Sequence, residues 1–132
     1  MAEAHRRSLR VALIVLAIVI GAAVSIGERL IFAAALSRDI DLSEIGVVTT
    51  NAVLTAFPFL YLALRSSTRL LPWLLGLTLT LAANGWWLAK GIAYQRAPDG
   101  SGVDMFGALL MLLSPFIVTV IVAVLDRPAA RR

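Results

Sequence analysis

The chain has no cysteine, a single histidine and few charged residues. Only 15% of its 132 residues are charged, whereas about 25% are charged in soluble domains. The lack of cysteine excludes disulfides, thiolate metal sites and cysteine nucleophiles. His5 lies in a basic segment ahead of the first apolar stretch, and one histidine cannot ligate a haem from both sides. We therefore expect no metal and no cofactor.

The chain is rich in long apolar stretches. Hydrophobic residues make up 60% of it, and its mean hydropathy is +0.89. Four apolar stretches fill most of its length, namely Leu9–Leu36, Gly46–Leu64, Leu70–Ala89 and Val103–Leu125. About 20 apolar helical residues cross a bilayer core of roughly 30 Å. We predict an all-α, polytopic membrane protein, in which residues 1–132 form one antiparallel up-and-down bundle of four transmembrane helices, over about 9–36, 46–64, 70–94 and 103–125.

Basic residues alternate between the ends of these predicted helices. If the N-terminus is cytoplasmic, eight of the twelve basic residues lie on the inner side: Arg6, Arg7, Arg10, Arg65, Arg69, Arg127, Arg131 and Arg132. The positive-inside rule then places both termini in the cytoplasm. The dominance of arginine over lysine on an alanine- and leucine-rich chain indicates a bacterial source, and hence the inner membrane. The basic fringe faces lipid headgroups, so we expect no nucleic-acid binding.

Helix ends and bends are also marked in the sequence. Asp41–Glu44 and Ser101–Asp104 each have the spacing of a capping box, which predicts two helix starts on the outer side. Pro58 and Pro115 fall inside predicted helices and remove backbone hydrogen bonds. We expect both helices to bend there.

Small and polar residues recur at helical spacing in every predicted helix, and such residues mark contact faces in lipid. On the first helix they are Ala17, Gly21, Ser25 and Glu28; on the second Glu44, Asn51, Thr55 and Pro58; on the third Trp73, Thr80, Asn84, Trp87 and Gly91; on the fourth Asp104, Gly107, Met111 and Pro115. We predict that Ala17, Gly21 and Ser25 form a packing groove. We also predict that the four faces converge.

Polar side chains gather in the outer third of the predicted bundle. At 1.5 Å per residue, Asn51 and Asn84 come to the same level, with Glu28, Trp87 and Lys90 about a turn higher. Two interpretations remain open. Intramembrane ionisable residues are costly and often functional, so these five residues are a candidate binding site for a polar or cationic ligand. Alternatively, Asn51 and Asn84 hydrogen-bond two helices together, while Glu28 and Lys90 extend to the interface.

We expect no enzyme activity, because Ser25 and Glu28 lie one turn apart without a histidine or a third orienting group. The layout resembles the small four-helix multidrug exporters, with one acid in the first helix and tryptophan in the third. Residues Ser25–Arg29 do not match the motif around their acid, so the resemblance is architectural.

Our leading hypothesis is therefore an accessory or assembly subunit. It would pack against the lipid bilayer and other membrane-protein subunits, or form a homo-oligomer. The alternative is a small transporter or ligand-binding bundle with an outward-facing polar site centred on Glu28.

Overall fold

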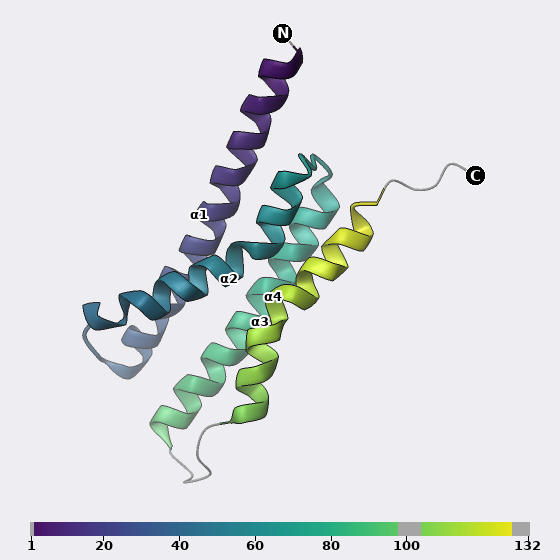
Figure 1. Ribbon diagram of the computed structural model, residues 1–132. Coiled ribbons are helices and arrows are strands. Elements are labelled where there is room, and N and C mark those ends of the chain that lie inside the picture. The colour runs from purple at the N-terminus through teal and green to yellow at the C-terminus, as the bar shows by residue number, and fades with distance from the viewer. Residues whose placement is uncertain (1, 98–103, 128–132) are drawn as a thin grey trace.

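A computed structural model describes residues 2–97 and 104–127, and this part of the chain is all-helical (Figure 1). Its elements are α1 (Ala2–Leu36), a 3₁₀ turn η1 (Leu42–Glu44), α2 (Ile45–Leu64), α3 (Leu70–Arg96) and α4 (Met105–Leu125). The prediction of four helices and an all-α fold is confirmed. The first helix begins at Ala2, because the basic segment ahead of the apolar stretch continues the same helix.

Three of the four helical segments are long and apolar enough to cross a membrane. They are Glu3–Leu36, Leu42–Leu64 and Met105–Leu125. α3 has 27 residues, about 40 Å at 1.5 Å per residue, so length does not limit it. It is less apolar because it contains proline, tryptophan, threonine and asparagine residues. Three of these, Pro72, Thr80 and Asn84, are buried inside the fold.

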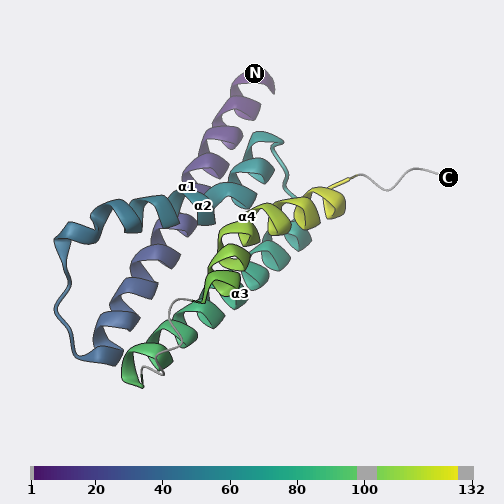
Figure 2. The ribbon, with the colours of Figure 1, turned by 60° about the horizontal axis from the view of Figure 1, so that its bottom comes forward.

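Successive helices run in opposite directions. The start of α1, the α2–α3 connection and the end of α4 lie toward one end of the molecule (Figures 1 and 2). The α1–α2 connection, the end of α3 and the start of α4 lie at the other. α1 packs mainly on α2, and α3 on α4, while α2 also contacts α4. The molecule is thus two helical hairpins, joined mainly by contacts of α2 with α4 and of α1 with α3.

The core is concentrated at the end where α2 meets α3. Phe59 is fully buried with Ala17 and Ala63, and its ring stacks on Trp73 with centroids 5.9 Å apart. A second cluster joins Leu62 to Val118 and Val122 of α4. α2 bends along its length and its first half lies away from α3 and α4 (Figures 1 and 2), as the interior Pro58 predicts. The first half of α2 is therefore separated from α3 and α4, whereas the end of α1 stays in contact with the end of α3, where Arg96 donates to the carbonyl of Ala35 at 2.9 Å.

Serine residues terminate two helices, and aspartate residues cap two helix starts. Ser37 and Ser66 have positive φ values of 51° and 54°, and each closes a Schellman motif in which the next residue's N–H reaches back to the last turn. Asp41 accepts from the N–H of Ser43 and Asp104 from that of Gly107. Asp41 caps as predicted, although the element that it caps is the 3₁₀ turn. Asp104, predicted as the acid that reaches back in the second box, is instead the N-cap of α4.

The reciprocal half of the first capping box is wrong, because the carboxylate of Glu44 pairs with Arg29 instead. Ser101, which begins the second predicted box, lies outside the described residues.

Candidate functional site

The predicted groove on α1 lies against α2. A Cβ built on Gly21 would stand 2.7 Å from the Cβ of Ala56, so the two backbones touch at this glycine. One turn further on, the buried Ser25 hydroxyl donates to the carbonyl of Val48 at 2.7 Å. Ala17 is fully buried on the same face. The close approach of these two helices fixes the level at which α1 side chains meet those of α2.

At the next turn the same face brings Glu28 to Asn51. The Nδ2 group of Asn51 donates to Oε2 of Glu28 at 2.8 Å, although the two residues are 23 positions apart. The second carboxylate oxygen, Oε1, is buried and has no partner in the described part of the chain. Glu28 is itself half-buried. One of its oxygens is thus held in place while the other is left to accept a hydrogen bond.

The nearby cations are engaged with other acids. Arg29 pairs with Glu44, and Lys90 pairs with Asp104 while its Nζ lies 4.8 Å from the ring centroid of Trp86. Lys90 lines neither of the cavities described below. It therefore lies apart from the other predicted site residues. Within residues 2–97 and 104–127, Glu28 has no ion-pair partner.

Two acids directly before helix starts, Asp104 and Asp41, have lowered pKa values. The hydrogen bond from Lys90, followed by that from the backbone N–H of Gly107, holds the pKa of Asp104 below its ordinary value. The backbone N–H of Ser43 does the same for the pKa of Asp41. Both carboxyls are therefore charged at neutral pH and fix the helix starts that border the site.

Asn84 stands opposite, on α3. It is only 4% exposed, and its Nδ2 group donates to the carbonyl of Thr80 at 2.8 Å. Its Oδ1 atom is buried without a partner among the described residues. The predicted hydrogen bond between Asn51 and Asn84 is not formed, because each amide donates to a group on its own hairpin.

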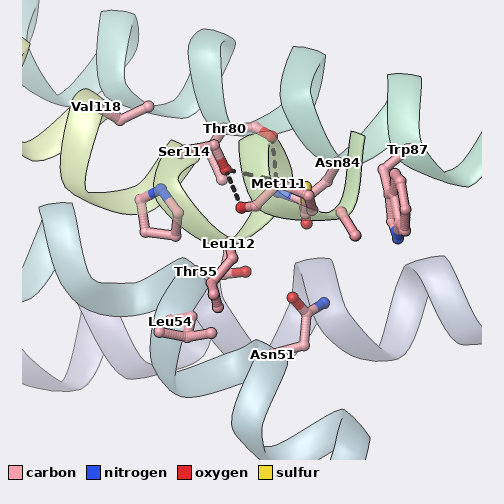
Figure 3. Close-up of a pocket in the computed structure, with 12 residues that line it drawn as sticks. Asn51, Leu54, Thr55, Thr80, Asn84, Trp87, Met111, Leu112, Ser114 and Val118 are labelled. Carbon is pink, nitrogen blue, oxygen red and sulfur yellow. Dashed lines mark hydrogen bonds between the residues drawn. The ribbon is translucent and has the colours of Figure 1, made fainter. Parts of the chain in front are cut away.

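Two cavities lie between the two hairpins, beside the first half of α2. The first, which we call the Asn84 cavity, has a volume of about 190 Å³. Figure 3 shows Asn51 and Thr55 on one wall of it and Asn84 and Trp87 on the other. The second, the Glu28 cavity, has a volume of about 280 Å³. Its lining includes Ser25, Glu28, Phe32, Val48 and Leu88, together with Arg29, whose guanidinium is paired with Glu44.

The cavities adjoin each other, since Asn51, Trp87 and Met111 line both. Much of this lining belongs to the faces predicted to converge. Thr55, Thr80 and Pro115 come from those faces as well. The lining residues that the sequence did not indicate, such as Phe32 and Leu54, are apolar side chains in apolar helices and carry no distinguishing pattern.

The cavities offer binding groups but no assembled nucleophile. The proton of the Ser25 hydroxyl is directed to the Val48 carbonyl rather than to Glu28. Among the described residues, no three His, Cys, Asp or Glu side chains lie close enough together to hold a metal ion. Two acceptor oxygens without partners among the described residues, an aromatic wall at Trp87 and a lining that mixes apolar and polar side chains are typical of a small-molecule binding site.

Comparison with known proteins gives no relative from which a function could be transferred to this chain. No protein family, no curated protein and no solved structure matches the chain. The function must therefore be argued from the site itself.

Proposed function

We propose that this chain is a small, non-enzymatic membrane protein that holds a polar or cationic ligand between its two helical hairpins, with Glu28 as the charged centre. The observation that carries the proposal is the carboxylate of Glu28, with one oxygen bonded to Asn51 and the other buried without a partner. A carboxylate at membrane depth is costly unless it is paired. A ligand that donates a hydrogen bond, or carries positive charge, would supply the missing partner.

The ligand proposal is tested by Glu28→Gln. Glutamine keeps the shape of the side chain and can still accept from Asn51, so the protein should fold with normal yield. We expect binding of small protonated amines, from methylammonium to benzylammonium, to weaken about tenfold or more, which corresponds to about 1.4 kcal/mol. Isothermal titration of the detergent-solubilised protein measures this change.

Glu3→Gln is the matched control, because Glu3 is exposed near the start of α1 and its loss should leave binding unchanged. Equal amine affinities in the wild type and Glu28→Gln would contradict the proposal, as would a wild type that binds none of the amines.

The topology proposal is that all four helices cross a bacterial inner membrane, with both termini inside. The apolarity of three helices and the clustering of arginine at one end support it. Because the chain has no cysteine, single cysteines can report the side directly. We expect an impermeant maleimide to label Asp39→Cys and Ala97→Cys from the periplasm, and Thr68→Cys only after the membrane is permeabilised.

These three positions are all exposed, so poor labelling would not reflect burial in the fold. Thr68 and Ala97 flank α3, the least apolar of the four helices. If both are labelled from the same side, α3 does not cross the membrane and the four-span topology is wrong.

A second candidate is the accessory or assembly subunit. The observation that favours it is the small core: only seven hydrophobic residues are buried in the described part of the chain, whereas large apolar side chains are exposed along α1 and α4. Lipid can cover these side chains, and so can a membrane-protein partner or a second copy. A Glu28→Gln protein that is stable and fully functional in the cell would favour this role over ligand binding.

A further inference from the structure

Asn84 presents an acceptor oxygen to its cavity, and its hydrogen bonding fixes that orientation. An amide has two N–H donors on one side and a carbonyl oxygen on the other. The neighbour on the helix side is the carbonyl of Thr80, which can only accept. The nitrogen of Asn84 must therefore face Thr80, and Oδ1 is the atom left without a partner. Figure 3 shows the oxygen directed into the space between the hairpins.

The surroundings of this oxygen are uncharged. The lining consists of seven apolar residues and five neutral polar ones, and no charged side chain is among them. The Ser114 hydroxyl already donates to the carbonyl of Met111 at 2.8 Å. A buried acceptor in such a lining calls for a neutral donor, because a charged group would lose its hydration without gaining a counter-ion.

The cavity is reached from the side of the bundle. Leu112 on α4, one of its lining residues, is 54% exposed, and Leu54 on α2 is partly exposed. If the helices cross a membrane as proposed, this rim faces lipid. A volume of about 190 Å³ is well above the roughly 10–15 Å³ that one water molecule needs on the same measure. That is room for one polar group and a few carbons.

We propose that the Asn84 cavity binds the hydroxyl end of an uncharged, single-chain amphiphile that enters from the bilayer between α2 and α4. The hydroxyl donates to Oδ1 of Asn84, the first carbons lie against Met111 and Val118, and the rest of the chain stays in lipid. This site goes beyond the ligand proposed for Glu28 and needs no charge. It depends on the membrane placement proposed above, but not on the binding of a cation.

The test uses photoreactive probes in vesicles of phosphatidylcholine, whose headgroup has no hydroxyl donor. One probe is a twelve-carbon alcohol that carries a diazirine near the oxygen. The diazirine then lies inside the cavity when the hydroxyl is bound to Asn84. The second is its methyl ether, which keeps the chain but loses the donor. We expect the alcohol to label the cavity peptides of α4 about tenfold more than the ether does, as read by mass spectrometry.

Variants assign the preference to Asn84. Asn84→Leu should remove it, whereas Ser114→Ala, which changes the same wall but not the unpartnered acceptor, should keep it. Glu28→Gln should also keep it, so a failure of the Glu28 proposal is distinguishable from a failure of this one. If Asn84→Leu does not fold, the comparison of alcohol and ether in the wild type still decides whether a donor is recognised.

Three results would overturn the inference. Equal labelling by alcohol and ether in the wild type would mean that water, not a lipid hydroxyl, satisfies Asn84. A preference that persists in Asn84→Leu would place recognition elsewhere. Stronger labelling of the same peptides by an alkylammonium probe of equal length would show that the cavity takes cations and belongs to the Glu28 site.

Discussion

Replacing Gly21 with leucine is expected to force α1 away from α2 and to destabilise the protein by about 3 kcal/mol, the upper end of the usual range for overpacking. Even a single added Cβ would come within 2.7 Å of the Ala56 Cβ and 3.0 Å of its backbone nitrogen. Backbone cannot give way as a flexible side chain does. In detergent, we expect the melting temperature to fall by roughly 10 °C.

Gly27 supplies the matched control on the same helix. A Cβ added there meets nothing within 4 Å, so Gly27→Leu changes helix propensity and volume without a clash. We expect it to leave the melting temperature nearly unchanged or slightly raised. Equal losses at Gly21 and Gly27 would mean that the α1–α2 contact does not have the geometry described.

Gly21 also shows what could be predicted from the sequence. The small residues Ala17, Gly21 and Ser25 recur every four positions and therefore lie on one face of α1, where they allow another helix to approach closely. That face is a contact face in the structure. The periodicity of α1 does not indicate which helix packs against this face, because a helix of a second copy or of another subunit would contact the same small residues. Only the fold shows that α2 occupies the groove.

Side-chain pairing was less predictable than helix position. Depth along each helix could be counted, and Asn51 and Asn84 do reach one cavity. Lys90, placed near Glu28 by the same counting, instead meets Asp104 across the α3–α4 connection. Arg29 likewise meets Glu44 across the α1–α2 connection. Ion pairs between long side chains depend on where each connection places the start of the next helix. Helical periodicity does not contain that information.

The cavities themselves were beyond prediction from the sequence. Pro58 predicts a bend in α2 but not its direction. The bend carries the first half of α2 away from α3 and α4 (Figure 2), and the space beside it becomes the Asn84 cavity. Had α2 bent the other way, Asn51 and Asn84 could have formed the hydrogen bond predicted for them, and no acceptor would have been left unpartnered.

The bond between Asn51 and Glu28 leads to the second large effect. Asn51→Leu removes the one hydrogen bond that the Glu28 carboxylate receives in the described structure, leaving a half-buried carboxylate without a donor. Hydrogen bonds to charged groups contribute about 1.5–3 kcal/mol, so we expect a destabilisation in this range. Thermal unfolding in detergent, with the wild type alongside, measures it.

A double-mutant cycle assigns that loss to the Glu28 carboxylate. When Glu28→Leu is added to Asn51→Leu, both partners of the hydrogen bond become apolar, and replacing both is far less costly than removing one. We therefore expect the double variant to recover most of the lost stability, about 1–2 kcal/mol. Lys90→Met in the Asn51→Leu background should recover none of it, since Lys90 is paired with Asp104. A loss on adding Lys90→Met that is larger in the Asn51→Leu background than in the wild type would show that the acid and the lysine form a pair after all. The unpartnered oxygen on which the ligand proposal depends would then have a partner within the chain.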